Sequence, residues 1–146
     1  HTRYISVTEF RRVLFRSDVY NYGQMQRDFT YIDDIVEAIF LLQDKIPQSD
    51  PHWTVENGSA AKSSAPYSIY NIGNSQPVAL MDYITALEEA LGITAKKNML
   101  PLQAGDVLDT SADTDGLYNL INFKPHTSVR EGVRKFVSWY RDYYKV

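Results

Sequence analysis

The 146-residue chain contains no cysteine, which excludes disulfide bonds, thiolate nucleophiles and cysteine-ligated zinc. It has no run of roughly 18–20 apolar residues, the length that a membrane-spanning helix needs. The formal net charge is −3 and basic residues form no stripe, whereas proteins that bind duplex nucleic acid are usually basic over one face. We therefore expect neither a nucleic acid nor a membrane among its partners.

The seven glycines are scattered, and none forms the closely spaced G-x-G-x-x-G turn that holds a dinucleotide pyrophosphate. The phosphate-binding P-loop and the G-x-S-x-G motif of serine hydrolases are absent as well. His1, His52 and His126 do not have the spacing of metal ligands. The residues of this chain therefore predict no metal site, no cofactor-binding turn and no catalytic group.

The first 17 residues differ from the remainder in charge. His1 to Ser17 reads HTRYISVTEFRRVLFRS and carries four arginines against one glutamate. It lacks helical or alternating periodicity, and it lacks the apolar core of a signal peptide. Because EFRRVLFRS resembles a translated sequencing adaptor, we interpret residues 1–17 as a non-native or disordered leader; a native basic arm is the alternative. Residues 18–146 are then the folded portion.

Short extended runs and amphipathic stretches follow one another in this portion, which is typical of an α/β fold. In the first amphipathic stretch, Ile35, Ile39, Leu42 and Ile46 recur on one side, so this side is expected to be buried. Helices are expected at 33–46, 79–91, 114–120 and from 129 onward, strands at 19–20, 29–32, 68–72 and 96–102, and a long polar loop at 47–66.

Local signals predict how several helices begin and end. Asp33 or Asp34 can cap the free N–H groups of the first helix. Ser128 followed by Glu131 forms a capping box before the last helix. Asn122 can adopt the left-handed conformation that ends the preceding helix.

The most informative stretch is RDFTYIDD, residues 27–34, which follows a glycine-bearing turn and precedes a helix. Arginine can donate two parallel charge-assisted hydrogen bonds to phosphate oxygens. Alternatively, Arg27 pairs with Asp28 or with the carboxylates of the helix and merely holds the turn. The residues alone favour neither interpretation.

The order of the motifs VYNYG, QRDFTYIDDIVEAI, YNIGNSQPVALMDYI, LQAGDVLDTSADT and FKPHTSVREGV closely resembles the C-terminal part of extended short-chain dehydrogenase/reductases acting on nucleotide sugars. Over residues 18–144 the chain is most similar to the NAD-dependent epimerases that interconvert UDP-glucuronate and UDP-galacturonate. The resemblance implies the substrate-binding portion of a Rossmann-type α/β fold, without the N-terminal dinucleotide-binding part. It also implies a cytoplasmic, homodimeric parent enzyme that serves polysaccharide biosynthesis.

The resemblance also implies roles for individual residues. Arg27 matches the arginine that binds the nucleotide diphosphate, and Asp106 matches the aspartate that accepts hydrogen bonds from the ribose hydroxyls. Gln103 stands where many relatives have a second diphosphate-binding arginine, so it offers only a neutral hydrogen bond. Val19 and Tyr20 match the strand that flanks the uracil. Without the resemblance, a cap of the following turn would be the better interpretation of Asp106.

Two positions depart from the pattern of the family. Ala104 replaces the usual proline before the glycine and aspartate of the turn, which loosens the turn but removes no functional group. Asn122 replaces the usual glycine after the penultimate helix.

The catalytic chemistry of the family resides in its N-terminal part. There the tyrosine of a Tyr-x-x-x-Lys pair removes the proton of the C4 hydroxyl while a hydride passes to NAD. The 4-keto intermediate then rotates, and the hydride returns to its other face. No tyrosine of this chain has a lysine four residues later, so the chain alone is expected to bind the UDP moiety without turnover.

Two other functions remain open. A nucleotide-sugar 4,6-dehydratase or decarboxylase has the same fold, and a free-standing nucleotide-binding module needs no cofactor. A truncated α/β piece should expose apolar surface that another part of the protein would cover. All three interpretations depend on Arg27 and Asp106 meeting around a single nucleoside diphosphate.

Overall fold

The computed structural model describes residues 17–145. The interpretation of the leader falls outside them, apart from Ser17, which pairs with Lys97 in a strand. The described residues form two compact units. Unit 1 comprises 17–27, 77–110 and 128–145, and unit 2 comprises 28–76 and 111–127. The described residues of the portion expected to fold, 18–146, therefore form two units. Unit 1 contains strands and helices, and the regular elements of unit 2 are helices.

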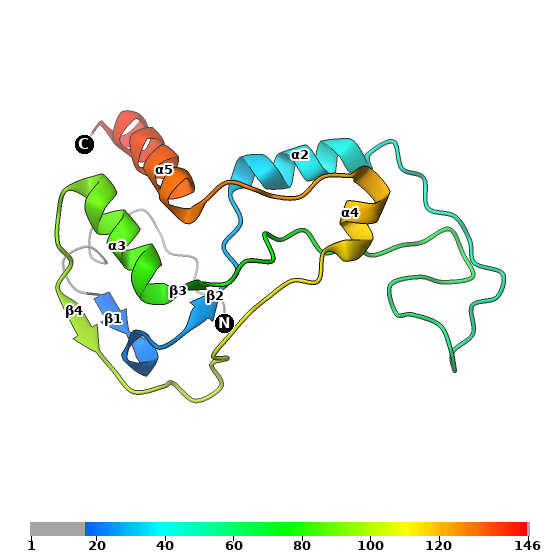
Figure 1. Cartoon of the computed structure of the whole chain (residues 1–146), viewed down its shortest axis with the longest axis horizontal. Helices are drawn as coiled ribbons and strands as arrows, with labels where there is room; N and C mark the ends of the chain where they lie inside the picture. Colours follow the sequence, from blue (N-terminus) through cyan, green and yellow to red (C-terminus); the bar gives the residue numbers. More distant parts are fainter. Residues whose placement is uncertain (1–16, 146) are drawn as a thin grey trace. The chain divides into compact units, whose positions relative to one another are not determined.

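Unit 1 contains all of the paired strands (Figure 1). Its elements are β1 (Ser17–Val19), η1 (Tyr20–Gly23), β2 (Gln26–Arg27), β3 (Val78–Ala79), α3 (Leu80–Leu91), β4 (Lys97–Met99) and α5 (Val129–Tyr144). Strands β1 and β4 are parallel, with Val19 opposite Met99. Strands β2 and β3 are antiparallel, with Arg27 opposite Val78.

The core of unit 1 lies between α3 and α5, which run side by side in Figure 1. Ala86 and Leu91 of α3 are buried against Val133 and Val137 of α5. Tyr83 packs at the edge of this cluster, and burial raises the pKa of its hydroxyl. These apolar residues recur at helical spacing, so the sequence pattern and the packing agree.

The expected ends of these helices are confirmed. The Ser128 hydroxyl accepts a hydrogen bond from the Glu131 N–H at 3.2 Å, as in a capping box. Gly92 ends α3 in the left-handed conformation, with φ of 69°. Asn122 ends α4 (Asp115–Ile121) in the same way, with φ of 52°.

Unit 2 is built from α2 (Ile32–Leu42) and α4, which contact each other. Ala38 and Leu117, one from each helix, are almost completely buried. The long segment between α2 and β3 contains no helix or strand, and only an isolated bridge joins Lys62 to Ser68. The long loop expected at 47–66 is therefore present and extends further along the chain.

Three expectations for unit 2 are wrong. The segments 29–32 and 68–72 do not form strands, because no strand of residues 17–145 pairs with either. Helix α2 ends at Leu42, so Ile46 lies beyond it and is 79% exposed. Ile39 is 55% exposed, so the apolar side that the spacing predicts is only partly buried.

The capping role expected of Asp34 is also wrong. Tyr31 occupies the N-cap of α2 and makes no capping bond with its side chain. The Asp34 carboxylate is buried and accepts hydrogen bonds from the N–H groups of Thr127 (2.9 Å) and His126 (3.3 Å). A buried carboxylate needs such donors, and in the first turn of α2 Asp34 faces the segment that provides them.

Glu88 joins α3 to the segment before β4 in unit 1. Its Oε1 atom accepts hydrogen bonds from the Ala95 N–H at 2.7 Å and from the Lys97 ammonium. The hydrogen bond from Lys97 is the main cause, and that from Ala95 the second, of a Glu88 pKa below its ordinary value of 4.5. Because folding lowers this pKa, the contribution of Glu88 to stability is present at neutral pH and is lost as the pH falls below about 4.5.

Replacing Glu88 by glutamine is expected to lower the free energy of unfolding by about 1 kcal/mol at pH 7, because charge-assisted hydrogen bonds become neutral ones. The difference from the parent chain should shrink at pH 3.5, as urea unfolding at the two pH values will show. Glu89→Gln is the matched control, since this neighbouring side chain is half exposed and pairs with Arg130 at the surface. A Glu88→Gln effect of equal size at both pH values would contradict the assignment.

Candidate functional site

All five residues with roles implied by the motifs lie in unit 1. Val19 ends β1, Tyr20 begins η1, and Arg27 ends β2. Gln103 and Asp106 lie on the segment that follows β4. The fold therefore brings together two stretches of chain, one around residues 19–27 and one around 103–108, and hydrogen bonds join them directly.

The strongest link between the two stretches is the guanidinium of Arg27. Its Nη1 donates to the carbonyls of Leu108 (2.9 Å) and Gln26 (2.8 Å), and its Nη2 donates to the carbonyl of Val107 (2.8 Å). The backbone N–H of Gln26 also donates to the Leu108 carbonyl at 3.0 Å. Strand β2 and residues 107–108 therefore lie side by side. An isolated parallel β-bridge between Gln26 and Asp109 extends this contact.

These three bonds leave Arg27 able to bind an anion. A guanidinium has five N–H donors, so two remain after the bonds to the carbonyls. Carbonyl oxygens are neutral and do not cancel the positive charge. Arg27 is half-buried, which fixes its position while part of the side chain stays accessible.

Asp106 ends a tight turn immediately before the carbonyls that Arg27 binds. Its N–H donates to the Gln103 carbonyl at 3.1 Å, and Gly105 has φ of 88°. A positive φ at the third position identifies a type II turn, in which proline is favoured at the second position. Ala104 occupies that second position, so the turn forms without the proline usual in the family. The side chain of Asp106 is exposed, one residue from Val107.

Val19 is almost fully buried, and its carbonyl accepts a hydrogen bond from the Leu100 N–H at 2.9 Å. That carbonyl is therefore engaged within the fold. Tyr20 is half-buried at the start of η1 and follows the strand directly. The structure thus places these two residues on the same stretch as Arg27.

Sequence reasoning anticipates a turn at residues 21–23 but misses its handedness. Asn21, Tyr22 and Gly23 have φ of 48°, 51° and 79°, three left-handed residues in succession. Glycine suits position 23 because it adopts a positive φ without strain, and a Cβ atom there would lie 2.6 Å from the Met81 sulfur, so that the Met81 side chain would have to shift. The N–H of Tyr22 donates a hydrogen bond to the Leu100 carbonyl at 2.9 Å, and its side chain is largely exposed.

Asp28, the next residue of the motif, has a structural role that sequence reasoning also misses. In unit 2 its Oδ2 atom accepts hydrogen bonds from the N–H groups of Ser75 (3.0 Å) and Ala112 (3.2 Å). The Ser75 hydroxyl donates to the Ala112 carbonyl at 2.8 Å. Gly73 lies against the same place, where a Cβ atom would be 2.6 Å from that of Ala112. One carboxylate therefore joins three distant stretches.

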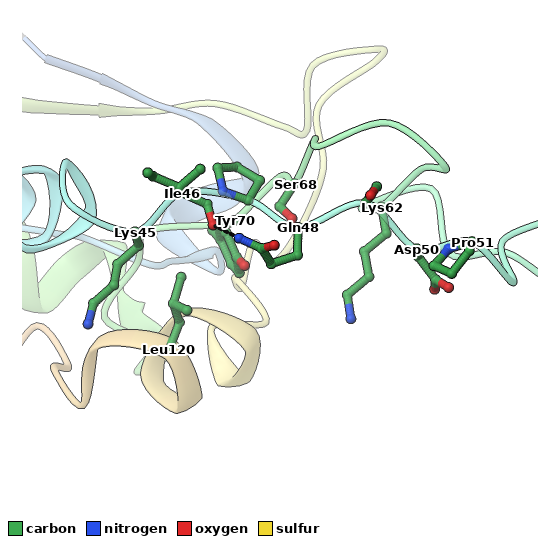
Figure 2. Close-up of a pocket in the computed structure, with 11 residues that line it drawn as sticks. Lys45, Ile46, Gln48, Asp50, Pro51, Lys62, Ser68, Tyr70 and Leu120 are labelled. Atoms are coloured by element: carbon green, nitrogen blue, oxygen red, sulfur yellow. Dashed lines mark hydrogen bonds between the residues drawn. The ribbon is translucent and has the colours of Figure 1, made fainter.

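Unit 2 contains a cavity of about 330 Å³ that none of the five residues lines. In the view of Figure 2, Gln48 and Tyr70 lie between Lys45 and Lys62, and Asp50 and Pro51 lie beyond Lys62. The amide of Gln48 donates to the Ile46 carbonyl at 3.2 Å, which folds this side chain over the cavity. The residues of the long loop thus line an open hollow of mixed polar and apolar character rather than an enclosed site.

The described part of the chain adds two negative findings. Within residues 17–145, no three His, Asp or Glu side chains are grouped so that they could hold a metal ion. In the same part, no helix combines the length and the apolar character needed to cross a membrane.

No protein-family model matches the chain, but individual relatives do. It is 70% identical over 129 residues to an Escherichia coli O111:H- protein named "Uncharacterized 37.6 kDa protein in cld 5'region" and 51% identical over 128 residues to Protein CapI of Staphylococcus aureus. It is 45% identical over 129 residues to the Rhizobium meliloti protein named "Probable UDP-glucuronate 4-epimerase". Each match covers 88% of this chain, whereas the chain spans only 38–39% of the length of these relatives.

Solved structures agree with the fold. The UDP-glucuronic acid 4-epimerase of Bacillus cereus in complex with NAD aligns with a TM-score of 0.63 at 24% identity, over 89% of this chain and 34% of that one. MoeE5 in complex with UDP-glucose and NAD aligns with a TM-score of 0.67 at 24% identity, over 88% and 38%. The predicted fold class, part of a Rossmann-type α/β protein, is confirmed.

Replacing Arg27 by lysine is expected to lower the free energy of unfolding by about 1 kcal/mol, because an ammonium cannot span the carbonyls of two successive residues as a planar guanidinium does. Thermal or urea unfolding of the two chains measures this effect. Arg134→Lys, an exposed position on α5, is the control and should change stability little. Equal stabilities of the Arg27→Lys chain and the parent would show that the bonds to residues 107–108 contribute nothing.

Proposed function

We propose that the chain is the UDP-binding part of an NAD-dependent epimerase among the UDP-glucuronate 4-epimerase-like extended short-chain dehydrogenase/reductases, whose C-terminal part it resembles. The observation that carries this proposal is the bond between Arg27 and the Val107 carbonyl, next to Asp106. It joins Arg27 to the residue that follows Asp106, in a chain that is 45% identical to a protein named "Probable UDP-glucuronate 4-epimerase".

In this proposal Arg27 neutralises the diphosphate. Its two remaining N–H donors and its uncompensated charge suit phosphate oxygens, which accept charge-assisted hydrogen bonds from arginine. Asp106 accepts hydrogen bonds from the hydroxyls of the ribose, because an ionised carboxylate is an acceptor only. The turn fixes the backbone at Asp106, and the bonds to the carbonyls fix the Arg27 guanidinium, before the ligand arrives. This lowers the entropy cost of binding.

Three residues complete the proposed grip. Val19 and Tyr20 flank the uracil at the end of β1. The carbonyl of Val19 already accepts a hydrogen bond from the Leu100 N–H, so the neighbouring backbone and side-chain groups provide the contacts to the base. Gln103 is the first residue of the turn that ends at Asp106. From this position its neutral side-chain amide donates a hydrogen bond to the diphosphate. By holding the nucleotide, these residues position the sugar for chemistry that occurs elsewhere in the enzyme.

The residues of this chain do not fit NAD. The N-caps of helices α2, α3, α4 and α5 are Tyr31, Ala79, Thr114 and Ser128, and none of these helices opens from a glycine-rich turn of the kind that binds a pyrophosphate. We therefore assign NAD, the Tyr-x-x-x-Lys pair and the hydride transfer to the part of the longer relatives that this chain does not match. The chain alone is proposed to be inactive, and the whole enzyme to be a cytoplasmic homodimer.

The whole-enzyme reaction can be tested with a chimera. Residues 18–146 replace the matching part of the 70% identical Escherichia coli protein, and the chimera is incubated with UDP-glucuronate and NAD. An epimerase returns an isomer of unchanged mass, UDP-galacturonate, which chromatography separates from the substrate. A product of lower mass would instead identify a dehydratase or decarboxylase, the second candidate on this fold.

Replacing Asp106 by asparagine in this chimera is expected to weaken UDP binding about tenfold or more, because a charge-assisted hydrogen bond contributes roughly 1.5–3 kcal/mol. Titration calorimetry measures the dissociation constant. A UDP analogue without the 2′ and 3′ hydroxyls should bind the variant and the parent equally, since it has no hydroxyl to donate. Asp142→Asn, at an exposed site on α5, is the control. If Asp106→Asn leaves UDP affinity unchanged, Asp106 does not bind the ribose.

A further inference from the structure

The hollow in unit 2 is lined by hydrogen-bond donors that have no partner in the described part of the chain. Among residues 17–145, the ammonium groups of Lys45 and Lys62 form no ion pair, and the hydroxyls of Ser68 and Tyr70 form no hydrogen bond. Ammonium and hydroxyl groups both donate hydrogen bonds. Four side chains therefore present unused donors at one place on the surface.

The two lysines differ from their surroundings, because unit 2 is acidic. Its residues 28–76 and 111–127 contain nine Asp or Glu side chains against three Lys and no Arg, which gives a formal charge of −6. Two of the three lysines line the hollow, and neither pairs with any of the nine carboxylates. Lys124 is the third, and it does not line the hollow. Unpaired cations that gather in a hollow attract an anion carried by a ligand.

Bonds within the long loop hold the hollow in shape. The Asp50 N–H donates to the Ser63 carbonyl at 3.1 Å, and an antiparallel bridge pairs Lys62 with Ser68. The Asp50 carboxylate, which also lines the hollow, accepts a hydrogen bond from the His52 N–H at 3.0 Å. Because the backbone already links both sides of the loop, a ligand meets a hollow that is largely formed, and little conformational entropy is lost on binding.

Apolar groups line the same hollow. Ile46 belongs to its lining, as does Leu120 of α4. The Tyr70 ring lies against α4 as well, since a Cβ atom on Gly116 would be 3.7 Å from this ring. The volume of about 330 Å³ falls within the range of small-molecule sites. Apolar groups beside hydroxyls and ammonium groups suit a sugar, whose ring has an apolar C–H face and a rim of hydroxyls.

We propose that the hollow binds an anionic saccharide, that is, a sugar that carries carboxylate or phosphate groups. In Figure 2, Gln48 and Tyr70 lie between Lys45 and Lys62. A sugar ring beside the Tyr70 ring then has an ammonium group on either side for its oxyanions. The hydroxyls of Ser68 and Tyr70 and the amide oxygen of Gln48 bind its hydroxyl groups.

This site is separate from the residues proposed to bind UDP. The hollow lies in unit 2, whereas Arg27 and Asp106 lie in unit 1. The inference therefore goes beyond the proposed function and does not rest on it.

An NMR titration of the isotope-labelled 146-residue chain tests the inference. The probes are digalacturonate and glucose 1-phosphate, which distinguish a carboxylated glycan unit from a sugar phosphate. At least one of them is expected to shift the amide signals of residues 45–51, 62 and 68–70 in a saturable manner. Maltose, which has two rings and no charge, should bind at least about fivefold more weakly, because it forms no ion pair with the lysines.

Substitutions locate the ligand. Lys45→Gln and Lys62→Gln are each expected to raise the dissociation constant of the bound probe about two- to fivefold. Lys124→Gln removes the same charge from unit 2 outside the hollow, so it is the matched control and should leave binding unchanged. Tyr70→Phe keeps the ring and removes the hydroxyl, with an expected loss of about threefold. The urea midpoints of the lysine variants should equal that of the parent, since all three lysines are exposed.

Several results would overturn the inference. Inorganic phosphate or a glutamyl-glutamate peptide that binds as tightly as the sugars would identify a general anion site or a peptide site. Equal effects of Lys62→Gln and Lys124→Gln would show that only the overall charge matters. Absence of saturable shifts with both probes would leave no saccharide site. Binding that is lost in the chimera described above would show that the rest of the enzyme occupies the hollow.

UDP is added as a competitor to separate this inference from the proposed function. It should not displace either probe, and displacement would place the probes at the nucleotide site instead. A chimera that binds an anionic saccharide at residues 45–70 but does not bind UDP supports the hollow and contradicts the proposed function. A chimera that binds UDP and neither probe does the reverse.

Discussion

The candidate site depends on one arginine that binds backbone rather than a carboxylate. Arg27 donates to the carbonyls of Val107 and Leu108, and in this way it fixes the stretch that follows the 103–106 turn against β2. A carboxylate paired with this arginine would have neutralised its positive charge. Because carbonyls take up its donors without cancelling its charge, Arg27 both organises the site and keeps the means to attract a phosphate.

Carboxylates organise unit 2 by the same principle with the signs reversed. Asp28 accepts from the N–H groups of Ser75 and Ala112, and Asp34 accepts from those of His126 and Thr127. Each joins segments more than 40 residues apart where no strand pairing is available. Asp28 and Asp34 of the RDFTYIDD motif therefore serve as structural anchors in unit 2, whereas Arg27 of the same motif keeps N–H donors for a ligand beside its bonds to backbone carbonyls in unit 1.

Elements that depend on residues close together in the chain are predicted well from the sequence. Helices α3 and α5, the Ser128 cap and the left-handed Asn122 depend on residues a few positions apart, and all are found as expected. The strand expected at 68–72 and the buried Ile39 depend on a neighbour, which residues 17–145 do not provide. The capping role expected of Asp34 is wrong because the partners of its carboxylate lie more than 90 residues away in the sequence. The role proposed for Asp106 comes from the family resemblance, since a lone aspartate after a glycine has many explanations.

The central claim is that Arg27 and Asp106 hold the same nucleotide. A crystal structure of the chimera with UDP tests it most directly. The account predicts a diphosphate oxygen within about 3 Å of the Arg27 guanidinium and a ribose hydroxyl at the same distance from the Asp106 carboxylate. UDP bound elsewhere, with Arg27 engaged only by the carbonyls of Val107 and Leu108, would contradict it.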